Sequence, residues 1–142
     1  MEFLPIQKHN ILSEFYITNG LEVSNDIEKD DGAIYSICLS INGKIAAAAT
    51  LSYRKETFIL DYIAVIVSER KNGIGKKAIG LIIEKARALG AEKIYISAKE
   101  PLFFSSVGFK NGAPPSYDIN RDCKKCSKLG VSCNPVPMVL EI

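Results

Sequence analysis

The sequence predicts an α/β fold, in which a mixed and mostly antiparallel sheet carries helices on both faces. Three observations lead to this prediction. Three β-rich segments follow one another within residues 33–67. Apolar residues then recur at helical spacing over residues 73–89. A further β-rich segment, residues 93–97, follows that helix, and a strand–helix–strand unit runs its two strands parallel.

The three β-rich segments are expected to form an antiparallel meander. Residues 33–41 alternate apolar and polar side chains, and Asn42-Gly43 suits the positive backbone angles of a tight hairpin turn. The return strand, residues 44–53, contains four alanines, which leave room for another element to pack closely. A turn at residues 54–56 leads into the long third strand, residues 57–67.

Three helices of different length are predicted. Residues 10–20 indicate a short helix, and residues 73–89 indicate a long amphipathic one that Gly90 ends. Residues 102–107 are expected to form one or two helical turns. The remainder is predicted as a short strand from Phe109, a loop over residues 111–135 and a closing strand, residues 136–142.

Composition limits the class of protein. The chain has 142 residues, of which 47% are hydrophobic and 24% charged, and we expect a single ordered domain over residues 1–142. No apolar run approaches the roughly 18 residues of a membrane span. The first residues lack the pattern of a secretory signal, so we expect a cytoplasmic protein whose four cysteines are reduced. A net charge of +2 is too small to indicate nucleic-acid binding.

The charges are unevenly placed along the chain. Residues 22–31 hold five carboxylates and one lysine, whereas cations gather at Arg70, Lys71, Lys76 and Lys77. This distribution either serves solubility alone or creates a positive field that suits an anionic cofactor and a negative field that suits a cationic substrate.

The most specific motif is Arg70-Lys71-Asn72-Gly73-Ile74-Gly75, between an apolar strand and the long helix. Unpaired backbone N–H groups and the dipole at a helix start bind anions, and glycines let a phosphate approach closely. The motif is not a Walker A loop, because Arg70 and Lys77 stand where that loop needs glycine and serine or threonine. A dinucleotide fingerprint fits weakly, and an ordinary strand-to-helix turn remains the alternative.

Two motifs together resemble the GCN5-related N-acetyltransferases (GNAT). That family has Arg/Gln-x-x-Gly-x-Gly/Ala after its fourth strand, which matches residues 70–75. Its Phe-Tyr-x-x-x-Gly-Phe motif is similar to Phe103-Phe104-Ser105-Ser106-Val107-Gly108-Phe109. The resemblance covers roughly residues 33–110.

The resemblance implies an acyl-CoA N-acyltransferase fold whose fourth and fifth strands splay apart around acetyl-CoA. It also implies that the cofactor's diphosphate meets backbone N–H groups at the helix start and that the pantetheine arm pairs with the preceding strand. A primary amine, on a small molecule or a peptide, would attack the thioester directly in a ternary complex, in a monomer or a homodimer. The implied cofactor-binding residues are Val65, Val67, Arg70, Lys71, Asn72, Gly73, Ile74, Gly75 and Lys76.

The catalytic residues of the resembled family are not matched. Phe104 stands at its frequent tyrosine acid, Ser97 at a frequent asparagine, and Ile59 at the acidic base of some members. We expect Asp61 to serve as the base, because strand alternation places it with Ile59, Ile63 and Val65. A carboxylate among apolar neighbours is a better proton acceptor. The alternative is an aspartate that faces water or a lysine.

The loop at residues 111–135 contains Cys123, Cys126 and Cys133. A Cys-x2-Cys pair and a third thiolate suit zinc, with a fourth ligand from Cys38, His9, Asp122 or water. A disulfide and free thiols remain the alternatives. We expect this loop to border the acceptor site.

Two other functions are compatible with the sequence. The missing family residues would suit a non-catalytic CoA-binding or regulatory module. The cysteines would suit a metal-binding interaction domain.

Overall fold

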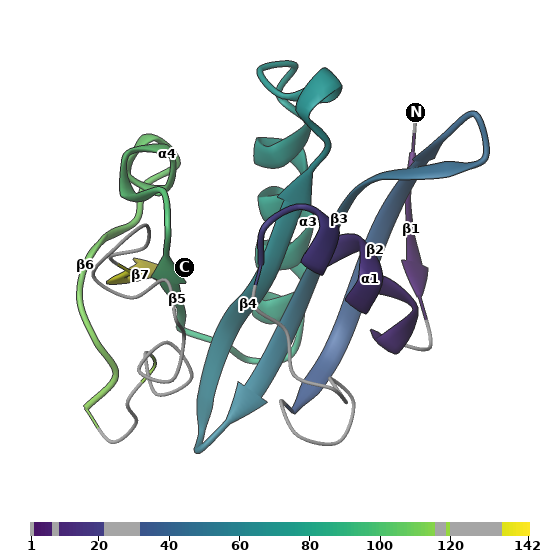
Figure 1. Ribbon diagram of the computed structural model, residues 1–142. Coiled ribbons are helices and arrows are strands. Elements are labelled where there is room, and N and C mark those ends of the chain that lie inside the picture. Colours follow the sequence, from purple (N-terminus) through teal and green to yellow (C-terminus); the bar gives the residue numbers. More distant parts are fainter. Residues whose placement is uncertain (1, 7–8, 22–31, 116–118, 120–134) are drawn as a thin grey trace.

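Seven strands form one sheet in the order β1-β2-β3-β4-β5-β7-β6 in the computed structural model (Figure 1). The structure describes residues 2–6, 9–21, 32–115, 119 and 135–142. The strands are β1 (Phe3–Ile6), β2 (Ala33–Ile41), β3 (Lys44–Arg54), β4 (Thr57–Val65), β5 (Lys93–Ala98), β6 (Lys110–Asn111) and β7 (Val136–Glu141). The helices are η1 (His9–Leu12), α1 (Ser13–Thr18), η2 (Val67–Glu69), α3 (Ile74–Ala88) and α4 (Pro101–Ser106).

The predicted fold class is confirmed. β2, β3 and β4 form the antiparallel meander, and β5 runs parallel to β4 after the α3 crossover. All other pairs in the sheet are antiparallel, including β7, which returns from the end of the chain to lie between β5 and β6. The sheet is therefore mixed and mostly antiparallel, as an acyl-CoA N-acyltransferase fold requires.

Helices cover both faces of the sheet, with α1 in front of it and α3 behind it in Figure 1. The alanines of β3 allow these helices to pack closely against the sheet. Ala47 and Ala49 belong to the core that contains the buried side of α3, whereas Ala48 packs with Leu12 and Tyr16 of the α1 region. Small side chains on alternate sides of one strand thus admit a helix on each face. None of the helices in the described ranges is long and apolar enough to cross a membrane.

The sequence did not predict β1. This strand has four residues and contains Pro5, which cannot donate a ladder hydrogen bond. Pro5 is tolerated because β1 lies at the edge of the sheet, where it pairs with β2 through the register Pro5↔Ile37. Local composition therefore gave no sign of a strand that tertiary pairing creates.

β4 ends at Val65, two residues earlier than predicted. The Ile66 N–H still donates to Ala46 O at 2.9 Å, but Val67 begins the 3-10 turn η2. Val65, Ile66 and Val67 all favour strands, yet the chain must turn here to enter α3. The extended conformation stops where the direction of the chain changes.

Candidate functional site

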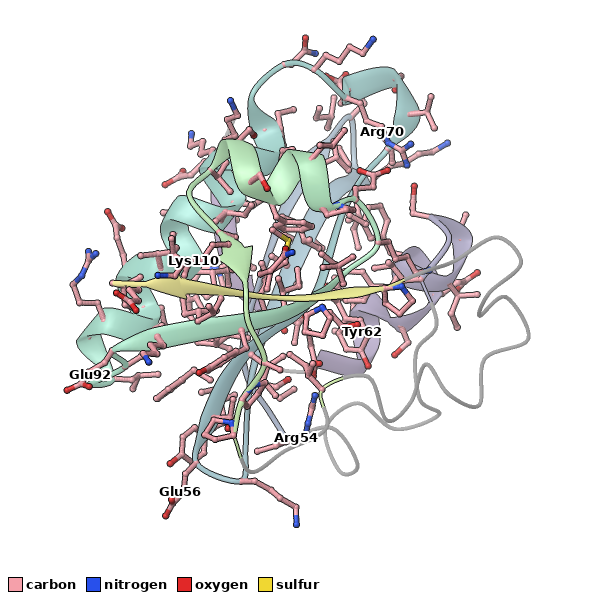
Figure 2. All side chains as sticks on the ribbon, turned by 90° about the vertical axis from the view of Figure 1, so that its left-hand side faces the viewer. Arg54, Glu56, Tyr62, Arg70, Glu92 and Lys110 are labelled. Atoms are coloured by element: carbon pink, nitrogen blue, oxygen red, sulfur yellow. The ribbon has the colours of Figure 1, made fainter. Side chains whose placement is uncertain are left out.

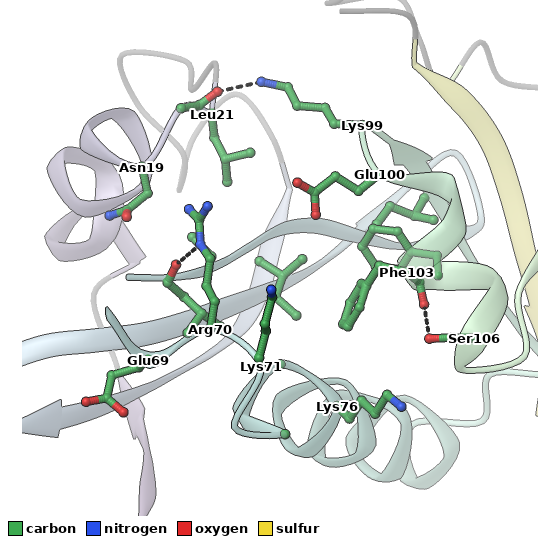
Figure 3. A pocket seen from close by; sticks show the side chains of 18 of the residues that line it. Asn19, Leu21, Glu69, Arg70, Lys71, Lys76, Lys99, Glu100, Phe103 and Ser106 are labelled. Atoms are coloured by element: carbon green, nitrogen blue, oxygen red, sulfur yellow. Dashed lines mark hydrogen bonds between the residues drawn. The ribbon is translucent and has the colours of Figure 1, made fainter. Parts of the chain in front are cut away.

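A cavity of about 890 Å³ lies where β4 and β5 part. Within the described chain, a single register pair, Ile59↔Tyr95, joins these two parallel strands. The cavity walls come from the second half of β4, the end of β5, the turn before α3 and its first residues, and one side of α4 (Figure 3). A further side is formed by the three residues that follow α1, namely Asn19, Gly20 and Leu21. A cavity of this volume can hold a large organic ligand.

The start of α3 presents backbone donors to one end of this cavity. Gly73 is the N-cap residue, with φ of 78°, and no side chain caps the helix. The first intrahelical hydrogen bond runs from Lys77 N–H to Gly73 O at 3.1 Å. The N–H groups of Ile74, Gly75 and Lys76 therefore have no partner inside the helix. Together with the helix dipole they form an anion-binding site.

The two glycines of the turn serve different purposes. A Cβ at Gly73 would meet nothing within 4 Å, so this position needs glycine for its positive φ alone. A Cβ at Gly75 would lie 3.2 Å from Phe103 Cζ and 3.9 Å from Val65 Cγ2. The absence of a side chain at Gly75 therefore leaves space in the cavity where α3, α4 and β4 meet.

Cationic side chains surround the same end. Arg70, Lys71 and Lys76 line the cavity, and Figure 3 shows Arg70 and Lys71 extending into it from the turn. Arg70 Nε donates a hydrogen bond of 2.9 Å to Val65 O. Glu69 also lines the cavity and accepts a 3.3 Å hydrogen bond from Asn72 Nδ2. Three cations, one carboxylate and the helix donors thus lie at the same end of the cavity, so the local charge is positive.

Six of the sequence-predicted cofactor residues line the cavity: Val65, Arg70, Lys71, Gly73, Gly75 and Lys76. The structure places the other three elsewhere. Val67 lies in η2, and 74% of the residue is exposed. Asn72 and Ile74 line a separate hollow of about 130 Å³ near Phe3, and Ile74 is buried in the core.

Asp61 lines the cavity, but its backbone is part of a β-bulge instead of the regular strand that the sequence suggested. The β3–β4 register passes from Thr50↔Tyr62 to Leu51↔Leu60, so Asp61 is the extra residue of a β-bulge. The expectation that strand alternation puts Asp61 on one face with Ile59 and Ile63 is wrong. Ile63 packs against the α3-side core, whereas Ile59 packs with Ile119 and Tyr95. A bulge reverses the facing of every residue that follows it.

The Asp61 carboxylate is paired with a guanidinium. Arg54 Nη1 lies 2.5 Å from Asp61 Oδ2, and Nη2 lies 2.8 Å from Oδ1. The side chains are only 11% and 12% exposed. Arg54 lies near the β3–β4 turn, below Tyr62 in the view of Figure 2. The expectation of purely apolar neighbours is therefore wrong, because β3 extends to Arg54 where the sequence suggested a turn.

A buried polar network lies on the α1 side of β3. The Tyr16 hydroxyl and Ser36 Oγ each lie 2.8 Å from Thr50 Oγ1. Tyr16 also stacks on Tyr62, with ring centroids 5.0 Å apart. Burial raises the pKa of Tyr16 far above its ordinary value, so the phenol stays protonated at neutral pH. Ser52 Oγ, on the same strand, is buried and has no hydrogen-bond partner among the described residues.

Phe104 has an apolar environment. It is 5% exposed, and its ring makes edge contacts with Phe103 and Phe109 at centroid distances of 5.1 and 5.7 Å. Phe104 and Ser97 both line the cavity. The position at which the resembled family often has an acidic tyrosine thus presents only carbon here.

Sequence reasoning missed the residues that bridge the cavity opposite α3. Lys99 Nζ donates to Gly20 O at 2.5 Å, which connects the end of β5 with the end of α1 (Figure 3). Asn19, Leu21 and Glu100 line the same part. Seventy-nine positions separate Lys99 from Gly20, so no local pattern could indicate this contact.

Several sequence predictions fall outside the described residues. These include the acidic segment at residues 22–31, most of the loop at residues 111–135, and the proposed ligands Cys123, Cys126 and Cys133. Where the structure does describe the chain, no group of three or more histidine, cysteine or carboxylate side chains could hold a metal ion.

Comparisons with known proteins agree with this geometry. The profile of the acetyltransferase (GNAT) family matches residues 6–109. An IAA acetyltransferase from Bacillus cereus ATCC 14579 is similar in structure, with a TM-score of 0.76 and 17% identity over 99% of both chains. No curated protein matches the sequence significantly.

Two other similar structures contain acetyl-CoA or coenzyme A. One is a GNAT family acetyltransferase from Elizabethkingia anophelis with acetyl-CoA bound, with a TM-score of 0.72 and 16% identity over 99% of this chain and 97% of that one. The other is N-acetylglutamate synthase from Neisseria gonorrhoeae complexed with coenzyme A and N-acetyl-glutamate, with a TM-score of 0.72 and 16% identity. The match covers 99% of this chain but 35% of the synthase. At these identities the likeness shows a shared fold.

Proposed function

Because the chain belongs to the acetyltransferase (GNAT) family, we propose that it transfers an acetyl group from acetyl-CoA to a primary amine. One observation carries this proposal. The cavity between β4 and β5 ends at a helix start whose backbone donors have no partner inside the helix and are surrounded by cations. This arrangement is complementary to a long thioester that ends in a diphosphate.

The diphosphate is proposed to bind the N–H groups at the start of α3. Gly73 and Gly75 permit close approach, and Arg70, Lys71 and Lys76 supply the opposite charge. Backbone donors fix the position of the phosphates, whereas the flexible cations mainly add long-range attraction.

The pantetheine arm is proposed to lie along the free edge of β4. The Ile66 N–H donates to Ala46 O in β3, so the backbone of Val65 faces the opposite way, toward β5. Pairing with Val65 would bring the thioester down the cavity toward Asp61. A backbone N–H at this edge would also stabilise the negative charge that develops on the thioester oxygen.

Asp61 is proposed to receive the acceptor amine at the deep end of the cavity, with Arg54 holding its carboxylate in place. The amine nitrogen attacks the thioester carbon, the C–S bond breaks, and CoA leaves as a thiolate. The proton that the nitrogen loses passes to the Asp61 carboxylate, directly or through water, although the pairing with Arg54 makes this carboxylate a weaker base than one among apolar neighbours. Phe104 has no proton to give, so the thiolate leaves without help from that position.

The first experiment measures acetyl-CoA binding by titration calorimetry and then CoA thiol release with a panel of primary amines. Acetyl-CoA binding together with amine-dependent thiol release is expected. Binding without release from any amine would favour the non-catalytic CoA-binding module, and failure to bind would contradict the proposal.

Substitutions on α3 give a matched control. Gly75→Val places methyl groups against Phe103 and in the cavity floor, so CoA affinity should fall at least about tenfold. Gly80→Val makes the same change on the same helix where a Cβ meets nothing within 4 Å, and it should leave affinity unchanged. Equal affinities for the two variants would contradict the assigned diphosphate site.

A further inference from the structure

We propose that Arg70 determines donor specificity, because it opposes binding of the pantetheine arm and favours binding of the diphosphate. The site would then select CoA thioesters over thioesters carried on a pantetheine arm without the nucleotide. This inference rests on the proposed function and adds a second role to a residue expected only to attract phosphate.

The Val65 carbonyl oxygen is the acceptor for which Arg70 and the pantetheine arm would compete. The Ile66 N–H faces β3, where it donates to Ala46 O, whereas the Ile66 carbonyl accepts from the Glu69 N–H of η2. Because backbone groups of successive strand residues point to opposite sides, the N–H and C=O of Val65 point away from β3, toward β5. The β4–β5 pairing lies six residues earlier, at Ile59, and Val65 lines the cavity between the parted strands. A ligand that adds to this edge as a strand would donate an amide N–H to Val65 O.

Arg70 already donates to that oxygen. Its Nε lies 2.9 Å from Val65 O, and the hydrogen bond is exposed to solvent. The guanidinium thus lies against the edge of β4 along which a pantetheine amide would approach. The two donors compete, and the cofactor must supply enough energy elsewhere to displace the side chain.

The diphosphate supplies that energy. Arg70 lies four residues before Ile74, at the cavity end where the helix donors converge. A guanidinium released from Val65 O has a flexible stem and a planar set of donors that bind phosphate oxygens well. A ligand with the diphosphate lets the guanidinium exchange a hydrogen bond to a neutral carbonyl for an ion pair with a phosphate, whereas a bare pantetheine thioester only loses the Arg70–Val65 bond.

The two halves of the cofactor should therefore respond in opposite directions to loss of the guanidinium. The probes are S-acetylpantetheine and ADP, and their dissociation constants are measured by NMR titration. In Arg70→Met, S-acetylpantetheine should bind about two- to tenfold more tightly, the equivalent of one net hydrogen bond no longer opposing it. ADP should bind about three- to tenfold more weakly.

Lys71→Met is the matched control. It removes a neighbouring cation from the same cavity but leaves the Arg70–Val65 hydrogen bond in place. It should weaken ADP and leave S-acetylpantetheine within twofold of the unaltered chain. Both side chains are exposed, and equal thermal unfolding temperatures would show that both variants are folded.

The outcomes separate this inference from the proposed function. If the unaltered chain binds CoA but Arg70→Met does not bind S-acetylpantetheine more tightly, the specificity role of Arg70 is overturned and the transferase proposal stands. If Lys71→Met gives the same gain, the effect comes from charge and the role is again overturned. If the unaltered chain does not bind CoA, both proposals fail.

Discussion

The Arg54–Asp61 pair predicts a large and measurable coupling in stability. Two hydrogen bonds of 2.5 and 2.8 Å join the charges, and only about a tenth of either side chain is exposed. At an effective dielectric constant of about 20, unit charges about 4 Å apart attract by about 4 kcal/mol. Removal of one partner leaves the other charge largely out of water, at a cost of about 2–4 kcal/mol.

A double-mutant cycle isolates the pairwise energy. Arg54→Met and Asp61→Leu should each lower the free energy of unfolding by about 2–4 kcal/mol. The double variant should lose no more than about 2 kcal/mol, because two apolar side chains replace both charges. The coupling energy, which is the sum of the two single losses minus the loss in the double variant, is then at least about 2 kcal/mol, and urea unfolding followed by circular dichroism measures it.

The exposed pair Lys110–Glu141 provides the control cycle. Its atoms lie 3.7 Å apart and its side chains are 68% and 63% exposed, so its coupling energy should be below about 0.5 kcal/mol. The reasoning is refuted if the losses at Arg54 and Asp61 simply add, or if both cycles give the same coupling. Asp61→Asn should also reduce turnover more than tenfold with CoA affinity unchanged, and unchanged turnover would remove Asp61 from the mechanism.

Three further predictions concern Gly73, Tyr16 and Cys38. Gly73→Ala should lower the free energy of unfolding by about 1 kcal/mol, because its φ of 78° disfavours a side chain; a thermal melt no lower than that of the unaltered chain would argue against this. Because burial raises the pKa of Tyr16, the unfolded chain loses the phenolic proton first as the pH rises. Stability from this group is therefore complete below about pH 10 and falls above it, and Tyr16→Phe should show a smaller fall between pH 8 and 11 in urea titrations, whereas equal falls would refute the assignment. Burial raises the pKa of the Cys38 thiol, so iodoacetamide at pH 8 should label it more slowly than an unstructured cysteine peptide; equal rates by peptide mass mapping would contradict this.

The anion-binding turn could be predicted because its requirements are local. Glycines at positions 73 and 75, cations beside them and an amphipathic helix after them all lie within a few residues. A helix start has free N–H groups wherever it occurs, so the letters alone indicate the chemistry. The cavity-lining positions of Arg70, Gly73 and Gly75 follow from the same local order.

The part of the cavity around Asp61, where the acceptor amine is proposed to bind, could not be predicted in the same way. The bulge at Asp61 exists only in the pairing of β3 with β4, and it changes which residues share a face. The contact between Arg54 and Asp61 spans a turn, and that between Lys99 and Gly20 spans most of the chain. No periodicity in one segment reports the register of another.

The sequence by itself determined the order of the elements from β2 to α4, the meander, the crossover helix and the phosphate-binding turn, because strand alternation, helical spacing and glycine geometry act over a few residues. Tertiary structure alone decided the edge strand β1, the insertion of β7 between β5 and β6, and the charged partner of Asp61. These features depend on which backbone hydrogen bonds and side chains meet after the chain folds. Long-range pairing energies, rather than local preferences, select them.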